Sequence, residues 1–239
     1  MLNMIEEAKF EALRRMCRDL KVPAPPEIFV GLKVHDQNGI LQLDDIQRGH
    51  SWTRNYYNYQ LGNLIEVAGV GDTTFAAGKI SGKQVGGTIT GTLNNGVSRS
   101  VDAASYYNRG TGENTTTGNF GIFVGTGVTA FSVEDTTLSN KVVPGNAANQ
   151  LLYNAMVYPV TSYNAGTKTW TNVISRVFNN NSGGTIVVTE TGLVWYSYLY
   201  GNLGYYLCER NLLSTSISLV NGAQLTVNYT LTMDFSAID

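Results

Sequence analysis

The fold of this chain is decided by the stretch from Arg176 to Phe235, which reads RVFNNNSGGTIVVTETGLVWYSYLYGNLGYYLCERNLLSTSISLVNGAQLTVNYTLTMDF. Runs rich in Val, Ile, Thr and Tyr alternate in it with polar turns. After the turn at Asn221 and Gly222, Thr and Asn occupy every second position between five apolar or aromatic residues, Leu225, Val227, Tyr229, Leu231 and Met233. A period of two is typical of a half-buried β-strand. This segment therefore predicts a strand with one apolar face and one hydroxyl-rich face.

The same pattern predicts strands along most of the chain. A hairpin comes first, with strands at 28–36 and 40–47 joined by a turn at Gln37, Asn38 and Gly39. Further strands are predicted at 120–124, 131–138, 151–161, 169–179, 185–199, 205–210 and 225–235. This number and spacing of strands predict a mainly β fold, an antiparallel β-sandwich of jelly-roll or immunoglobulin-like type.

Residues 1–26 predict an amphipathic helix followed by a proline arm. Apolar side chains recur at helical spacing from Ile5 to Leu20, and Pro23, Pro25 and Pro26 end the helix. The helix can fold back over a face of the sheet, or it can reach out and dock on another subunit. In the second case the contact would be made by Ile5, Leu13, Met16 and Leu20.

Residues 27–239 are expected to form the β-sandwich domain. Within it, a second helix is predicted after His50, capped by Ser51 or Thr53 and stopped by Gly69. A Gly- and Thr-rich insertion around 69–119 follows, in which two short strands at 88–93 and 98–103 are expected to form a flap.

The composition excludes several kinds of partner. Only 14% of the 239 residues are charged and the formal net charge is −2, so the chain has no basic surface for nucleic acid. No apolar run approaches the ~20 residues of a membrane span, and the charged N-terminal residues do not resemble a signal peptide. We therefore expect a soluble, unprocessed chain with no nucleic-acid or membrane partner and no disulfide between Cys17 and Cys208.

Motifs that could carry chemistry are weak. The segment GTGVTA at 125–130 matches part of a dinucleotide-binding fingerprint, but no helix is predicted after it, so a tight connection between two strands is the better interpretation. The only histidines, His35 and His50, have no further ligands at metal-binding spacing. The sequence therefore predicts no catalytic residue, no cofactor and no metal, and the chain is expected not to be an enzyme.

The tyrosines are a stronger candidate for contact. In a strand, Tyr196, Tyr198 and Tyr200 would line one face beside Trp195. Such a face can be a subunit interface, ordinary sheet packing or a platform on which a sugar stacks.

Four blocks of the chain resemble a group of tailed-bacteriophage virion proteins: HSWTRNYYNYQLGNL, GIFVGTGVTAFSVEDTTL, ISRVFNNNSGGTIVVTETGLV and LLSTSISLVNGAQLTVNYTL. The resemblance implies a non-enzymatic structural component of the virion at the neck, tail or head surface, made in the host cytoplasm. Its partners would be other virion proteins and copies of itself, as a homo-oligomer. The alternative is a host-surface or glycan-binding module of the virion.

Overall fold

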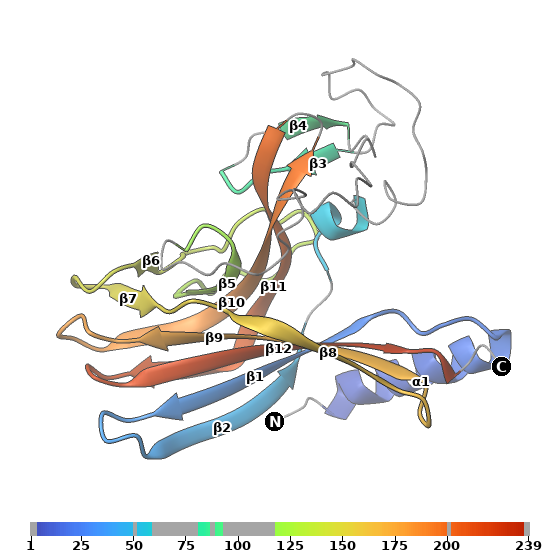
Figure 1. Ribbon diagram of the computed structural model, residues 1–239, viewed down its shortest axis with the longest axis horizontal. Helices are drawn as coiled ribbons and strands as arrows, with labels where there is room; N and C mark the ends of the chain where they lie inside the picture. The colour runs from blue at the N-terminus through green and yellow to red at the C-terminus, as the bar shows by residue number, and fades with distance from the viewer. Residues whose placement is uncertain are drawn as a thin grey trace. The chain divides into compact units, whose positions relative to one another are not determined.

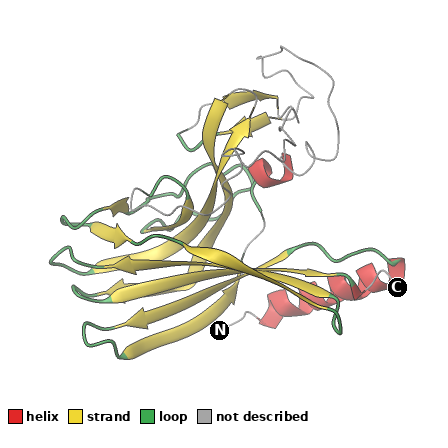
Figure 2. Cartoon of the chain, in the orientation of Figure 1, coloured by secondary structure: helices red, strands yellow, loops and turns green. Residues whose placement is uncertain are grey.

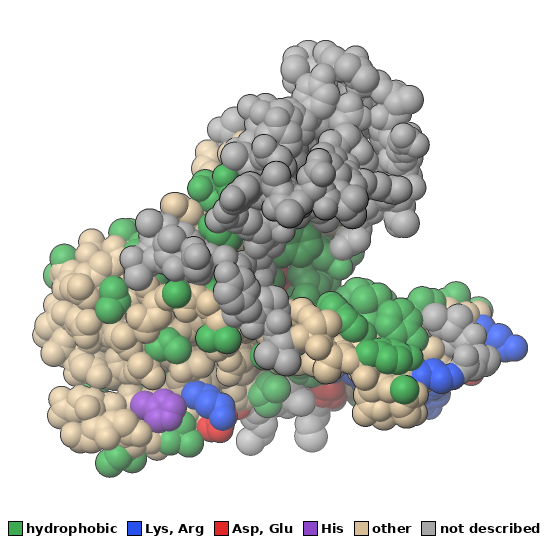
Figure 3. Space-filling model, in the orientation of Figure 1, with side chains coloured by type: hydrophobic (Ala, Val, Ile, Leu, Met, Phe, Trp, Pro, Cys, Tyr) green, Lys and Arg blue, Asp and Glu red, His purple; other side chains and the backbone are tan. Residues whose placement is uncertain are grey.

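The computed structural model describes residues 4–49, 52–58, 81–86, 89–92, 118–199 and 202–236. The fold is mainly β, as predicted, with one long helix, α1 (Met4–Leu20), and a short helical run at 54–58 (Figures 1 and 2). The described surface in Figure 3 carries few charged side chains, which agrees with the composition.

The largest sheet has seven strands in the order β2-β1-β12-β9-β7-β6, with β8 also beside β9. Its strands are β1 (Glu27–His35), β2 (Leu41–Arg48), β6 (Val143–Pro144), β7 (Gln150–Tyr153), β8 (Val157–Asn164), β9 (Thr169–Asn179) and β12 (Gln224–Asp234). The central pairs β1 with β12 and β12 with β9 are antiparallel over nearly their full length. Strands close to both ends of the sequence therefore lie side by side at the centre of the sheet (Figure 1).

Two smaller sheets complete the fold. One has the order β11-β10-β5, built from β5 (Gly121–Gly125), β10 (Ile186–Leu199) and β11 (Asn202–Leu219). The other pairs β3 (Ser81–Lys83) with β4 (Ile89–Thr92). The chain divides into two compact units: unit 1 comprises 1–49, 145–186 and 214–239, and unit 2 comprises 50–144 and 187–213. The N-terminal helix and proline arm thus belong to the same unit as six strands of the large sheet, β1, β2, β7, β8, β9 and β12.

The core of unit 1 is built by the strand with the clearest alternation. Leu225, Val227 and Tyr229 of β12 are fully buried, whereas the Thr and Asn residues between them are half-buried. Across the pair, Leu32 of β1 lies opposite Val227 and is also buried. The period of two therefore sorts the side chains into an inner and an outer face, as predicted.

The predicted hairpin is also confirmed. β1 and β2 are joined at the expected turn, where Gly39 adopts a φ of 78° that favours glycine. The Asp36 carboxylate accepts hydrogen bonds from the backbone N–H groups of Asn38 and Ile40 at 2.8 and 2.9 Å. The Asp36 side chain thus accepts hydrogen bonds from backbone N–H groups of the turn, in place of backbone acceptors.

Other boundaries differ from the predictions. Residues 131–138 form no strand, because Ser132 and Asp135 close a local turn: the N–H of Asp135 donates to the Ser132 carbonyl, and the N–H of Ser132 donates to the Asp135 carboxylate. The strand predicted at 151–161 is divided into β7 and β8. β11 continues nine residues beyond the predicted end at Arg210, to Leu219.

The second helix and the flap are partly described. A helical run begins at Arg54, directly after Thr53, one of the two predicted cap residues. The Thr53 hydroxyl donates to the Leu207 carbonyl at 2.6 Å, so its hydrogen is used in a contact with β11. In the flap, β4 covers most of the strand predicted at 88–93 and pairs with β3. Ser51, Gly69, the strand predicted at 98–103 and most of the insertion at 69–119 lie outside the described residues.

The buried face of β12 gives a first test. Replacing Val227 by Asp places a carboxylate among fully buried side chains, which costs several kcal/mol, comparable to the ~5–15 kcal/mol stability of a whole domain. We expect Val227→Asp to be unfolded or insoluble, as measured by chemical denaturation. The control is Thr226→Asp, on the other face and opposite Lys33, which is expected to fold. A normally stable Val227→Asp protein would contradict the observed register.

Candidate functional site

The helix α1 presents one face to the sheet and another to solvent. Phe10 and Leu13 are half-buried and Cys17 is buried, a spacing that places them on one side of the helix. Met16 and Leu20 are 58% and 66% exposed. Of the four residues predicted to contact a partner, Leu13 therefore lies toward the inner side and Met16 and Leu20 are exposed, while the Ile5 side chain lies outside the description.

Arg48 of β2 connects α1 to the large sheet. Its guanidinium lies 3.9 Å from the ring centroid of Phe10 on the helix and 4.6 Å from that of Phe29 on β1. Arg48 also donates to both carboxylate oxygens of Glu7, at 2.6 and 2.7 Å, and to Glu27. Glu27 in turn accepts hydrogen bonds from Arg14. Because Arg48 and Glu27 are buried, this network supplies the partners that buried charges require.

We call Arg48 and the residues that it joins, Glu7, Phe10, Arg14, Glu27 and Phe29, the Arg48 network. This network bears on whether the helix folds back over the sheet or docks on another subunit. It shows that α1 folds back on its own sheet through the face that carries Glu7 and Phe10. Docking on another subunit through the exposed side, with Met16 and Leu20, stays a prediction.

The predicted tyrosine face is only partly described. The Tyr196 ring stacks on Tyr205 at a centroid distance of 5.0 Å and on Phe120 at 5.3 Å. Within this stack Tyr196 is packed inside unit 2, which is the sheet-packing alternative for this residue. Tyr198 lies on β10 with its side chain outside the description, and Tyr200 lies outside the described residues.

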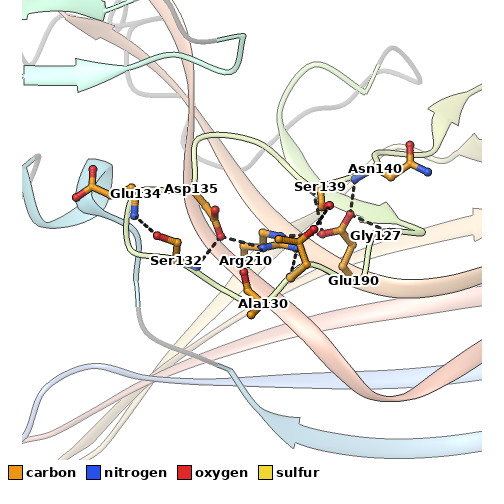
Figure 4. A network of polar contacts seen from close by, with 10 residues as sticks. Gly127, Ala130, Ser132, Glu134, Asp135, Ser139, Asn140, Glu190 and Arg210 are labelled. Carbon is orange, nitrogen blue, oxygen red and sulfur yellow. Dashed lines mark hydrogen bonds and ion pairs between the residues drawn. The ribbon is translucent and has the colours of Figure 1, made fainter.

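The glycine segment after β5 surrounds a buried carboxylate. Glu190 of β10 is fully buried, and its Oε1 accepts hydrogen bonds from the backbone N–H groups of Gly127 at 3.1 Å and Asn140 at 2.7 Å. Its Oε2 accepts from the N–H of Ser139 at 3.1 Å and from Nε of Arg210 at 2.7 Å (Figure 4). Four donors therefore hold the two oxygens of one side chain, so the hydrogen-bonding needs of this buried carboxylate are met within the chain.

Arg210 of β11 extends this network along the loop. Its Nη2 donates to the Thr129 carbonyl at 2.7 Å, and its Nη1 donates to the Ala130 carbonyl at 3.3 Å and to the Asp135 carboxylate at 2.9 Å (Figure 4). One buried guanidinium thus joins β10, β11 and the irregular segment 126–140. We call these residues, Gly127, Thr129, Ala130, Asp135, Ser139, Asn140, Glu190 and Arg210, the Glu190 network.

The geometry of the Glu190 network fits a structural role. The N–H groups of the glycine segment point at a carboxylate of the same chain, in the manner in which a nucleotide-binding loop would hold a phosphate. No helix follows in residues 126–140, all of which are described. The prediction of a tight connection between two strands is wrong: β5 ends at Gly125, the next strand, β6, begins only at Val143, and residues 126–140 form an irregular segment that the Glu190 network holds in place. The Glu190 carboxylate has no exposed surface, and both of its oxygens are hydrogen-bonded to groups of the same chain.

Sequence reasoning missed both networks. Glu190 is separated by 50 or more residues from the loop groups that it binds, and spacing arguments reach only near neighbours. A signal was present, because Glu190 and Arg210 each interrupt a strongly apolar strand, in IVVTETGLV and YLCERNLL. Charged residues in such a setting are buried only when they are paired.

Other candidate groups give no further site. Within the described ranges, no group of three or more His, Cys, Asp or Glu side chains is placed to hold a metal ion. His35 lies at the end of β1, and His50 lies outside the described residues. Cys17 and Cys208 are both buried and free, and burial raises the pKa of the Cys208 thiol well above its usual value. No described helix is both long enough and apolar enough to span a bilayer.

No protein-family model matches the chain, no curated protein matches its sequence, and no solved structure matches its fold.

The packing around the Glu190 network can be tested by adding one methyl group at Gly125, which lies beside it. A Cβ at Gly125 would lie 2.5 Å from Glu190 Oε1 and 2.7 Å from the Asn140 carbonyl oxygen, both of which are fixed by hydrogen bonds. We expect Gly125→Ala to lower the free energy of unfolding by about 1–3 kcal/mol. The matched control is Gly184→Ala, where a Cβ meets nothing within 4 Å. Equal stability of the two variants would contradict the described packing.

The Arg48 network predicts a dependence on pH. Hydrogen bonds from Arg48 hold the pKa of the Glu7 carboxyl below its usual value, so Glu7 contributes stability that is complete above the unfolded-state pKa of about 4.3 and is lost as the pH falls through the lower, folded-state pKa. We expect Glu7→Gln to reduce the loss of unfolding free energy on acidification below about pH 5. Asp19→Asn, in the exposed last turn of α1, is the control. An unchanged pH profile in Glu7→Gln would exclude this contribution.

Proposed function

We propose that the chain is a non-enzymatic structural component of a tailed-bacteriophage virion that works through repeated contacts with copies of itself and with other virion proteins. The resemblance of four sequence blocks to such proteins supports this assignment. The commitment of the buried Glu190 carboxylate and the Arg210 guanidinium to fixing a loop supports a structural rather than a catalytic use of the most active-site-like residues.

The observation that carries the proposal is a part of the large sheet that extends past its core. We call it the outer sheet: β8, residues 169–173 of β9 and residues 231–234 of β12. None of its described side chains is buried, whereas the same two long strands bury Phe178 and Leu225 completely further along. Figure 3 shows hydrophobic side chains gathered over this end of unit 1.

The outer sheet is well suited to contact with another protein surface. Asp234 is the only charged residue in it, so a partner could cover the outer sheet without removing many charges from water. Strands that are half-exposed on both faces bury little apolar area in the isolated chain. Their stability would increase on assembly.

A β-sandwich remains the proposed arrangement of unit 1. The large sheet buries one face, and Ile217 and Leu219 from the last part of β11 are buried in the same unit. The Asn180 amide donates to the Leu219 carbonyl at 2.6 Å, and the N–H of Ser214 donates to the Gln47 side chain at 2.8 Å. These contacts support a second layer over the sheet.

The proposal is tested on particles. We expect mass spectrometry of purified virions made by the phage whose genome encodes this chain to detect the chain in stoichiometric amounts, and deletion of its gene to yield incomplete particles. Purified recombinant chain is expected not to bind host cells. A chain absent from the particles would refute the proposal, and host-cell binding by the isolated chain would favour the host-surface alternative.

A further inference from the structure

The strand β8 forms an edge of the large sheet whose outer side could receive another strand. β8 pairs with β9 and with no other strand of the described sheet. Every second residue of an edge strand directs its backbone N–H and C=O groups away from the sheet, where another strand can bind them. The sequence of β8, VYPVTSYN, contains no charged residue.

Natural edge strands are usually protected, and β8 is protected over only half of its length. Its first half contains Pro159 and an irregular register between Val157 and Val160. From Val160 to Asn164 the register with β9 is continuous. The regular half has Ser162 at its centre and carries exposed Thr, Ser, Tyr and Asn side chains at 161–164.

A row of large side chains crosses the outer sheet and ends at this edge. Tyr163 of β8 lies opposite Trp170 of β9, and Trp170 lies opposite Met233 of β12. Tyr163 is 58% exposed, and Trp170 and Met233 are half-buried. The row lies on the face opposite to α1, because the helix contacts the face that carries Glu27 and Phe29. An added strand would continue this face of the outer sheet as well as the hydrogen bonding.

We propose that the occupant of this edge is the β8 strand of a second copy of the chain, paired antiparallel about a two-fold axis with Ser162 opposite Ser162 of the second copy. In this register Tyr163 lies opposite Thr161 of the second copy. The sheet faces that carry Tyr163 in the two copies therefore lie on the same side of the joined sheet. It uses the whole regular half of β8 and excludes the irregular half. The proposal deepens the proposed function and rests on it for the need to self-associate.

The distribution of charge favours a second copy at β8 over one at β2. β2 lies at the far end of the strand order and carries Asp44 and Asp45 near its centre. A symmetric antiparallel pairing of two β2 strands would bring these carboxylates close to those of the second copy, and like charges opposite one another destabilise a pair. β8 is self-complementary because its own residues carry no charge to repel.

The expected association is weak in solution and strong in a particle. Pairing five residues on each side buries less surface than a standard stable interface, so the free chain should exchange between monomer and dimer. In an assembled particle, neighbouring contacts hold two copies close together and raise their effective concentration. The contact would therefore form during assembly rather than before it.

The test is a charge exchange at position 162, measured on the full chain by analytical ultracentrifugation over a range of concentrations. We expect Ser162→Lys and Ser162→Glu each to weaken dimer formation about tenfold or more, because each places like charges opposite one another. An equimolar mixture of the two variants should restore association, since unlike charges then face each other. The matched control is Gln42→Lys on the exposed part of β2, which should associate like the unaltered chain.

Three results would overturn the proposal. These are an unaltered chain that stays monomeric at the highest concentration reached, charged variants that associate as well as the unaltered chain, and a mixture that fails to restore association. Oxidative cross-linking of Ser162→Cys gives an independent readout, and efficient cross-linking between copies supports the register. If the dimer forms but the chain is absent from virions, the proposed function fails and this pairing stands. If the chain is in virions but substitutions at position 162 do not change its association, the β8 pairing is wrong and the proposed function stands.

Discussion

The burial of Glu190 beside Arg210 is the constraint on which unit 2 depends. A charge with no exposed surface must be paired and hydrogen-bonded, and removal of one partner from such a pair typically costs about 3–5 kcal/mol. The partners of this pair fix the position of a fifteen-residue segment, 126–140, that has no regular structure of its own. Two charged side chains, from β10 and β11, therefore hold this segment in place, and the segment has no strand pairing of its own.

Unit 1 uses the same device for a different purpose. Arg48 joins β2 to the helix by stacking between Phe10 and Phe29 and by pairing with Glu7 and Glu27. In both units a buried arginine connects elements that are distant in the sequence. The chain carries few charges overall, and some of them are used inside it to join distant elements.

The sequence predicted correctly those elements that depend on interactions between residues close together in the chain. The alternation of β12 and the Asn38–Gly39 turn were predicted correctly because neighbouring residues decide the face and the turn. The strand expected at 131–138 was wrong because Ser132 and Asp135 form hydrogen bonds that compete with a ladder, and Arg210 holds Asp135 from a distant strand. The partners of Glu190 and Arg48 depend on tertiary contacts, which a reading of spacing along one chain does not contain.

During synthesis, β1 leaves the ribosome long before its central partner exists. Glu27 pairs with Thr232 and His35 with Gln224, so the middle of the large sheet closes only when residues 224–232 have emerged. Until then the buried faces of β1 and β9 lack the strand that separates them, and unpaired strands of this kind are prone to aggregate. Closure of the largest sheet therefore waits for the synthesis of β12, and a chain terminated before Gln224 would lack the strand at the centre of this sheet.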